Sequence, residues 1–208
     1  MHTEIEAKLK VSSLKVIQQK LSACGAGFVA DQRHKDSYFD DADMTFTSTD
    51  RCIRLRRQLV GGREDVILTY KGPKEKDKFK RRRELELEVK DSVSAEEFFS
   101  VLGYEKVLSF EKKRQVYHLG DCEIALDEVP LLGDFVEIEG PSAEKIVNVQ
   151  KVLGLSDVPH ITQSYADMIR EKLCQLGKMH ARGKEAKREK PATHKKNISR
   201  SKSRGKRK

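Results

Sequence analysis

The first stretch of the chain alternates charged and apolar side chains. The charged residues Glu4, Glu6 and Lys8 occupy every second position, and apolar residues lie between them. A period of two is typical of a β-strand, in which successive side chains point to opposite faces. The same alternation recurs in residues 51–57 and 82–89. The pattern predicts a sheet with one apolar face and one heavily charged face.

Eight segments carry a strand pattern, and turn residues separate most of them. Gly61-Gly62 predicts a tight hairpin between two of these segments. The predicted strands are residues 4–8, 28–40, 51–57, 66–71, 82–89, 107–118, 122–129 and 134–139. Eight meandering strands are the number found in a small closed barrel. We therefore expect a mainly β fold with flanking helices (α+β), built on an eight-stranded antiparallel closed barrel.

Four helices are predicted around these strands. Three of them begin at a residue type that commonly caps a helix N-terminus. The candidate caps are Ser12 or Ser13, Ser94 with Glu97 as a capping box, and Ser142. The fourth helix is expected to run from about Ser164 to Leu176. Residues 41–50, between two strands, are expected to form a loop.

The net charge of +9 is unevenly distributed along the 208 residues. Residues 178–208 hold 14 Lys and Arg against two Glu, a local charge of +12, which leaves 28 basic and 31 acidic residues in 1–177. The tail has almost no apolar residues and is expected to be disordered. We therefore expect a barrel domain over 1–177 and a basic tail over 178–208.

The basic tail allows three interpretations. It could bind RNA, DNA or polyphosphate through salt-sensitive contacts. In a eukaryotic host it could direct the protein to the nucleus. It could also be a solvated extension with no dedicated partner, because no aromatic residue follows Lys178 to stack on bases.

Four cysteines lie far apart in the sequence, with no CxxC spacing. This spacing favours reduced thiols over a zinc site or a disulfide framework. No apolar run is long enough for a membrane span, and the polar N-terminus is unlike a signal peptide. We therefore expect a cytoplasmic protein with no membrane partner.

The charged face has two explanations. In an open sheet it would be the solvated side, where charges maintain solubility. In a closed barrel the charges would converge on one axis, where like charges need a ligand to balance them. Arg and Lys would then bind phosphate oxygens, and carboxylates would bind a hard cation such as Mg²⁺ or Mn²⁺. A metal–triphosphate complex would satisfy both sets, and the periodicity leaves the two explanations open.

Eight short blocks, in order, resemble the CYTH superfamily of triphosphate tunnel metalloenzymes, and most of all its class IV adenylate cyclase branch. Residues 4–8 are similar to the ExExK signature of that family. The blocks are residues 4–8, 38–40, 46–56, 68–73, 82–86, 112–114, 126–129 and 132–139. The resemblance covers about residues 2–175 and implies an eight-stranded barrel closed into a tunnel.

The resemblance also implies roles for individual residues. Carboxylates for Mg²⁺ or Mn²⁺ would come from Glu4, Glu6, Glu137 and Glu139, joined by Asp127, with Glu84 and Glu86 binding metal or supporting it. The triphosphate would be bound by Lys8, Arg54, Arg56, Lys71, Arg82, Lys112 and Arg114. Lys8 and Asp127 are the residues expected to take part directly in catalysis. Parity with Arg114 favours Lys112 over Lys113 as the inward neighbour, while Arg57, Arg83 and Glu88 are expected outside.

Three functions are consistent with this site. A class IV adenylate cyclase would convert ATP to cyclic AMP and pyrophosphate. A triphosphatase would hydrolyse inorganic triphosphate, thiamine triphosphate or a nucleoside triphosphate with the same residues, so tunnel residues alone do not separate the two enzymes. A non-catalytic module binding phosphate or RNA is the third. The expected partner is a small-molecule triphosphate, and a homodimer is left open.

Overall fold

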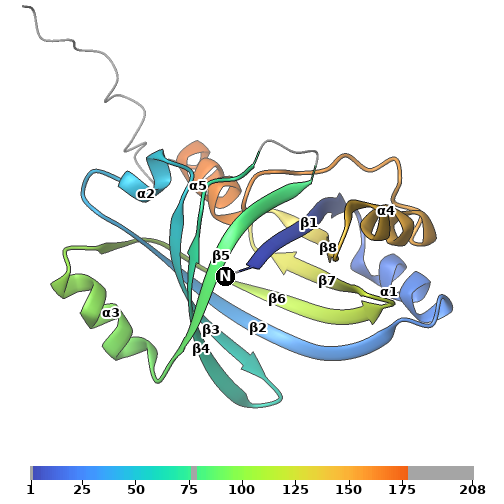
Figure 1. Cartoon of the computed structure of the whole chain (residues 1–208), viewed down its shortest axis with the longest axis horizontal. Helices are drawn as coiled ribbons and strands as arrows, with labels where there is room; N and C mark the ends of the chain where they lie inside the picture. Colours follow the sequence, from blue (N-terminus) through green and yellow to red (C-terminus); the bar gives the residue numbers. More distant parts are fainter. Residues whose placement is uncertain (1, 76–78, 178–208) are drawn as a thin grey trace, which may run out of the picture.

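A computed structural model describes residues 2–75 and 79–177, with backbone alone for residues 2–4 and 80 (Figure 1). The predicted basic tail, residues 178–208, lies outside the described residues. Within the described ranges, no helix combines the length and the apolar character that crossing a membrane requires. All four cysteines are free thiols, as the sequence predicts.

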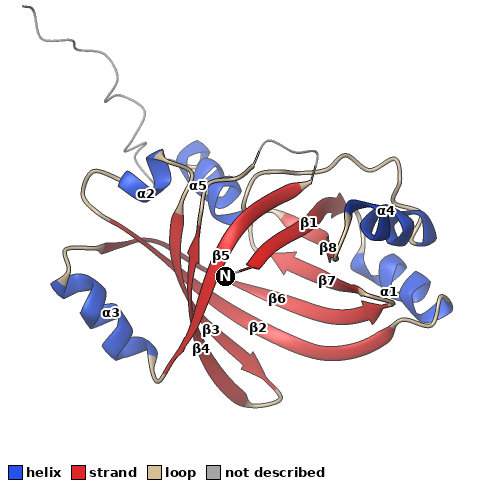
Figure 2. Cartoon of the chain, viewed as in Figure 1, coloured by secondary structure: helices blue, strands red, loops and turns tan. Residues whose placement is uncertain are grey.

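Eight antiparallel strands form one closed barrel (Figure 2). They are β1 (His2–Val11), β2 (Gly27–Asp40), β3 (Cys52–Val60), β4 (Arg63–Lys71), β5 (Lys80–Val89), β6 (Glu105–Leu119), β7 (Cys122–Val129) and β8 (Gly133–Glu139). The strand order around the barrel is β1-β5-β4-β3-β2-β6-β7-β8, and β8 pairs with β1 to close it. The predicted fold class is confirmed, and the Gly61-Gly62 turn has the positive φ angles expected of a tight hairpin.

Within residues 2–75 and 79–177, five helices lie between or after the strands. They are α1 (Leu14–Ala23), α2 (Thr45–Ser48), α3 (Ser92–Val101), α4 (Ala143–Val152) and α5 (Tyr165–Gln175). The predicted cap Ser142 accepts a backbone N–H at the start of α4. Ser164 does the same at the start of α5. Ser13 is the N-cap residue of α1, but its side chain makes no capping hydrogen bond.

Two local predictions were wrong. Asp91, and not Ser94, is the N-cap of α3, because the Asp91 carboxylate accepts the Ser94 N–H at 2.8 Å. Residues 41–50 include the short helix α2 and are not simply a loop. The carboxylate of Asp40, at the end of β2, fixes this helix by accepting the N–H groups of Phe46 and Thr47.

The main apolar core lies outside the barrel wall. The outer face of β1, β7 and β8 packs against α1 and α4, and Leu9 and Ile138 from the strands meet Leu21 and Ile146 from the helices. All four side chains are fully buried. Burial of apolar surface on this outer face stabilises the fold and leaves the inner face for polar groups.

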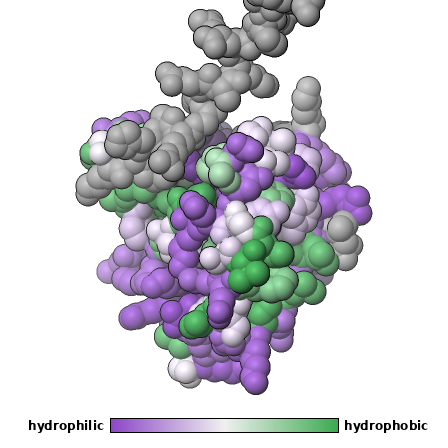
Figure 3. Space-filling view, turned by 90° about the vertical axis from the view of Figure 1, so that its left-hand side faces the viewer, coloured by the Kyte–Doolittle hydropathy of each residue, from purple (hydrophilic) through white to green (hydrophobic). Residues whose placement is uncertain are grey.

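The opposite side of the barrel is less covered. Phe99 of α3 stacks on Phe39 of β2 with ring centroids 4.6 Å apart, but Phe98 and Val101 of the same helix remain exposed. Leu85 and Leu87 on the outer face of β5 are also exposed. Figure 3 shows the apolar area on the side of the molecule where α3 lies.

Candidate active site

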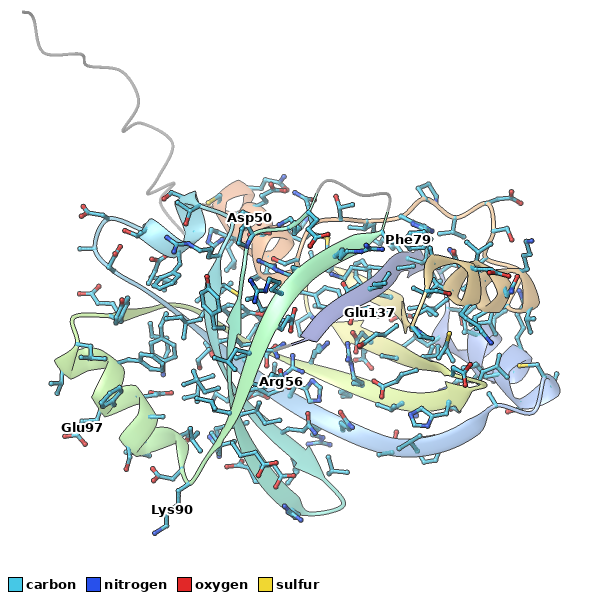
Figure 4. All side chains as sticks on the ribbon, viewed as in Figure 1. Asp50, Arg56, Phe79, Lys90, Glu97 and Glu137 are labelled. Carbon is cyan, nitrogen blue, oxygen red and sulfur yellow. The ribbon has the colours of Figure 1, made fainter. Side chains whose placement is uncertain are left out.

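The inner face of the barrel surrounds a cavity of about 460 Å³, which we call the tunnel. All eight strands contribute to its lining, together with residues of α2 and α5. In Figure 4, Arg56 and Glu137 lie within the barrel, whereas Lys90 and Glu97 point away from it. The charged side chains that alternate along the strands therefore face into the barrel. The explanation that they form the solvated side of an open sheet is wrong.

Twelve of the fourteen side chains predicted to bind metal or triphosphate line the tunnel. They are Glu6, Lys8, Arg54, Arg56, Lys71, Arg82, Glu84, Glu86, Lys112, Arg114, Glu137 and Glu139. Asp127 does not line it. The side chain of Glu4 lies outside the described residues, although the backbone of Glu4 pairs with Arg82. Arg57, Arg83 and Glu88 are exposed and away from the tunnel, as predicted.

Strand register brings three carboxylates into one row. Glu6 of β1 lies opposite Glu139 of β8, and Glu139 lies opposite Glu123 of β7. Directly opposed residues of an antiparallel pair share one face of the sheet, and all three line the tunnel. One step along the strands, Lys8 lies opposite Glu137.

Carboxylates pair with the arginines and lysines on β3 and β4. Arg56 makes a bidentate pair with Asp36 of β2, at 2.7 and 2.8 Å. Burial opposes ionisation of Asp36, but the charge and hydrogen bonds of Arg56 outweigh it and hold the pKa of Asp36 well below its usual range. Lys71 pairs in the same way with the buried Glu84. Asp36 is therefore ionised, and the paired side chains are already oriented before a ligand binds.

Arg54 is linked to β4 and β5 across the inner face. Its guanidinium donates to the Thr69 hydroxyl at 2.9 Å and to the Glu86 carboxylate at 3.3 Å. Burial disfavours the charged form of Arg54, but nearby anionic groups, Asp36 foremost, outweigh burial and raise its pKa. Arg54 therefore presents a fixed positive charge to the tunnel.

Asp127 lies directly behind the tunnel lining. It is fully buried, and its carboxylate accepts hydrogen bonds from Arg114 at 2.7 Å, Lys112 at 2.9 Å and the Tyr165 hydroxyl at 2.9 Å. Burial raises the pKa of Asp127, but Arg114 and Lys112 outweigh burial and lower it. Asp127 therefore orients two tunnel cations from behind the lining, and its expected role among the metal ligands stays a prediction.

Lys112 combines burial with several charged neighbours. Burial disfavours the ammonium form, Arg114 adds repulsion, and Asp127 only partly offsets both, so the pKa of Lys112 is lowered to about 8. Lys113, the next residue, pairs with the exposed Glu128 on the outer surface. The parity prediction that Lys112 points inward is confirmed.

Arg82 lines the tunnel and also ties two loops together. Its guanidinium donates to the carbonyl oxygens of Gly72 at 2.8 Å and Asp50 at 2.9 Å. Asp50 in turn accepts the backbone N–H of Lys74 at 2.7 Å. Arg82, one of the residues predicted to bind triphosphate, therefore also stabilises the positions of these two loops.

Several residues that line the tunnel were not predicted from the sequence. His34 and Asp36 lie on the same parity of β2 as Tyr38, so the strand alternation could have identified them. Burial and the charges of Arg56, Lys112 and Arg114 hold the pKa of His34 well below its usual range, so the imidazole is neutral. Tyr165 begins a helix and carries no strand signal.

The donor set fits a hard divalent cation. Glu6, Glu137 and Glu139 present carboxylate oxygens to one cavity, and such oxygens are the ligands that Mg²⁺ and Mn²⁺ prefer. Glu137 is held by Lys8 at 3.2 Å and by Arg114. Among the described side chains, no three His, Cys, Asp or Glu are already gathered around one point.

A family model for the CYTH domain matches residues 2–165 of this chain. Two curated proteins are similar along most of its length. A proposed adenylate cyclase of Methanocaldococcus jannaschii is 29% identical over 174 residues, covering 79% of this chain and 97% of that protein. The adenylate cyclase CyaB of Aeromonas hydrophila is 24% identical over 180 residues, covering 82% and 90%.

Solved structures share the fold. A protein from Pyrococcus horikoshii has a TM-score of 0.72 at 32% identity and covers 81% of this chain and 99% of its own. A Hippeastrum protein, described as a proposed adenylyl cyclase with a dominant triphosphatase activity, has a TM-score of 0.64 at 17% identity and covers 86% and 98%. The chain belongs to the CYTH family and is an enzyme of the triphosphate tunnel type.

Proposed function

We propose that this protein is a divalent-metal-dependent adenylate cyclase of the class IV type, which converts ATP to cyclic AMP and pyrophosphate inside the tunnel. The observation that carries the proposal is the joint presence of arginines, lysines and carboxylates around one cavity inside the closed barrel. Relatives named as adenylate cyclases, similar over 79% and 82% of this chain, support the choice of reaction.

The tunnel cations would bind the triphosphate. Arg54, Arg56 and Arg114 can each bind phosphate oxygens through two parallel N–H groups, whereas Lys71 and Lys112 act as point charges. Held in this way, the leaving pyrophosphate gains negative charge where fixed donors already lie. These residues would therefore stabilise the transition state as well as bind substrate.

Glu6, Glu137 and Glu139, together with Glu4, would hold the divalent cation. When bound, Mg²⁺ or Mn²⁺ would lower the pKa of the ribose 3′-hydroxyl and neutralise charge on the phosphates. The carboxylates would hold the cation near the arginines proposed to bind phosphate, since both sets line the same cavity.

Ligand binding would exchange the partners of these charges. In the described state Lys71 contacts Glu84, Arg54 contacts Glu86, and Arg114 contacts Glu137. A triphosphate offers the cations new oxygens, and a metal ion offers the carboxylates a new cation. The cations would then exchange a carboxylate for a phosphate, and the carboxylates would exchange a side-chain cation for the metal ion. No buried charge would be left without a partner.

One end of the tunnel offers space for an organic group. Phe46 of α2 lines the cavity, and its ring carries the Arg51 guanidinium 5.1 Å from the centroid. Cys52 and Val107 add apolar surface to the same cavity. Aromatic and guanidinium planes favour stacking with a base, which favours a nucleotide over inorganic triphosphate.

A triphosphatase is the second candidate. Water would replace the ribose hydroxyl as nucleophile, and the same cations and carboxylates would serve. The dominant triphosphatase activity described for the Hippeastrum protein of the same fold is the observation that favours it.

Product analysis by anion-exchange chromatography separates the two. The protein is incubated with ATP or with inorganic triphosphate, each with Mg²⁺ or Mn²⁺ and with an EDTA control. Cyclic AMP and pyrophosphate from ATP are the expected products. Orthophosphate without cyclic AMP would replace the cyclase by the triphosphatase, and no metal-dependent product from either substrate would contradict both.

A further inference from the structure

Tyr165, the first residue of α5, contacts three charged groups at the tunnel. Its hydroxyl donates to Asp127 at 2.9 Å. The Lys8 ammonium lies 4.1 Å from the ring centroid, and the Lys112 ammonium lies 4.7 Å from it. One side chain therefore contacts a lysine of β1, a lysine of β6 and a carboxylate of β7.

These contacts act on flexible side chains. A lysine has a four-carbon stem and many rotamers, so an ammonium group is placed well only when its surroundings hold it. An ammonium over an aromatic face is attracted by the ring, and the attraction grows where water is excluded. Lys8 and Lys112 are both almost fully buried. The ring therefore attracts both ammonium groups and restricts where each one lies.

The segment that carries Tyr165 is itself well anchored. Ser164 and Asp167 form a reciprocal capping box at the start of α5, and the carbonyl oxygen of Gln163 accepts a hydrogen bond from Lys8 at 3.0 Å. The Tyr165 ring packs edge-on against Phe135, with centroids 5.2 Å apart. A fixed backbone and a packed ring give Tyr165 the rigidity needed to position its neighbours.

We propose that Tyr165 is a positioning residue of the active site, which orients Lys8 and Lys112 toward the bound triphosphate. The proposal rests on the proposed function, since it assigns phosphate to these two lysines. The first turn of α5 follows the barrel strands in the sequence. Under this proposal it also contributes to the active site. Asp127, which Tyr165 also contacts, links the ring to Arg114.

Two substitutions separate the ring from the hydroxyl. Tyr165→Phe keeps the ring and removes the hydrogen bond to Asp127, whereas Tyr165→Leu removes both. Leu173→Ala is the matched control, because Leu173 lies on the same helix and packs against the same apolar cluster but does not line the tunnel. Both Tyr165→Leu and Leu173→Ala remove packing around α5, but only Tyr165→Leu removes the ring beside Lys8 and Lys112.

Calorimetric titration with a non-hydrolysable triphosphate analogue and Mg²⁺ measures the effect on binding. We expect Tyr165→Leu to weaken analogue affinity about tenfold and Tyr165→Phe about threefold. Leu173→Ala should lower Tm while leaving the affinity unchanged. Wild-type affinity in Tyr165→Leu, or equal weakening in Leu173→Ala, would overturn the positioning role.

Lysine NMR tests the geometry without turnover. Protons next to the ammonium groups of Lys8 and Lys112 should be shifted upfield by the ring, with assignments made through Lys8→Arg and Lys112→Arg. The shift should persist in Tyr165→Phe and vanish in Tyr165→Leu. Absence of the shift in the wild type would overturn the proposal. Absence of analogue binding in a wild type that shows the shift would instead contradict the proposed function.

Discussion

Two faces of the same strands have opposite chemistry. On the outer face of β1 and β8, Leu9 and Ile138 pack without water beneath α1 and α4. On the inner face of these strands, Glu6, Lys8 and Glu137 line the tunnel. The usual arrangement of an apolar inside and a polar outside is reversed within the barrel.

This difference separates stability from chemistry. The outer layer contributes free energy of unfolding through apolar burial, whatever ligand the tunnel holds. The paired charges inside contribute little net stability, because desolvation offsets their attraction. They can therefore exchange partners when a ligand arrives. Substitutions on the two faces should differ in what they change.

The largest effect is expected from Glu6→Gln. The substitution keeps the shape of the side chain and removes the charge of one of the inner-face carboxylates proposed to bind the metal. We expect kcat to fall at least about 100-fold with little change in Tm, measured by initial rates over a range of metal concentrations. Glu88→Gln is the control. Glu88 alternates with the apolar residues of β5 in the same way, but it lies at the exposed end of that strand. Full activity in Glu6→Gln would contradict the metal assignment.

Leu21→Ala should act on stability alone. Leu21 of α1 is fully buried in the outer core, so we expect unfolding free energy to fall by about 2–5 kcal/mol in urea titrations. KM and kcat of the folded protein should stay unchanged. Val16→Ala, on the exposed side of the same helix, should cost far less. A Leu21→Ala variant that lost activity while folded would weaken the separation of the two faces.

Lys112 should set the alkaline limit of substrate capture. Its pKa of about 8 means that the ammonium is present below pH 8 and is lost as the pH rises through this value. Affinity for an anionic triphosphate should then decline, so kcat/KM should fall above about pH 8. Lys112→Arg stays protonated and should keep kcat/KM level to higher pH. An unchanged alkaline limb in Lys112→Arg would exclude Lys112 as its origin.

The smallest effect is expected at the neighbouring residue. Lys113 pairs with Glu128 on the exposed outer surface, where such pairs contribute little. Lys113→Ala should change the unfolding free energy by less than about 0.5 kcal/mol and leave KM for the triphosphate unchanged. If Lys113→Ala raised KM as much as Lys112→Ala, the assignment of Lys112 to the inner face and Lys113 to the outer face would be contradicted.

Much of this architecture follows from alternation. The period of two identifies the eight strands and places Arg54 and Arg56 on one face, because side-chain direction is a local property of a strand. Whether that face lies inside or outside depends on closure between β1 and β8, which are far apart in the sequence. Periodicity therefore left the open sheet and the barrel equally possible, and the resemblance to a known family favoured the barrel.

Other features depend on tertiary contacts that carry no local signal. Asp127 has the parity of an inward residue, but Lys112, Arg114 and Tyr165 enclose it. Tyr165 itself begins a helix, so strand alternation could not point to it. Asp91 and Ser94 are both good cap residues three positions apart, and composition does not choose between them.

The most direct measurement is a crystal structure of the protein with Mn²⁺ and a non-hydrolysable triphosphate analogue. We expect anomalous signal for manganese inside the barrel beside Glu6, Glu137 and Glu139, with phosphate oxygens on Arg54, Arg56 and Arg114. The carboxylates and arginines that pair in the described state should have exchanged partners. Manganese or triphosphate bound only on the outer surface, with the tunnel ion pairs unchanged, would contradict the assignment of the inner face as the active site.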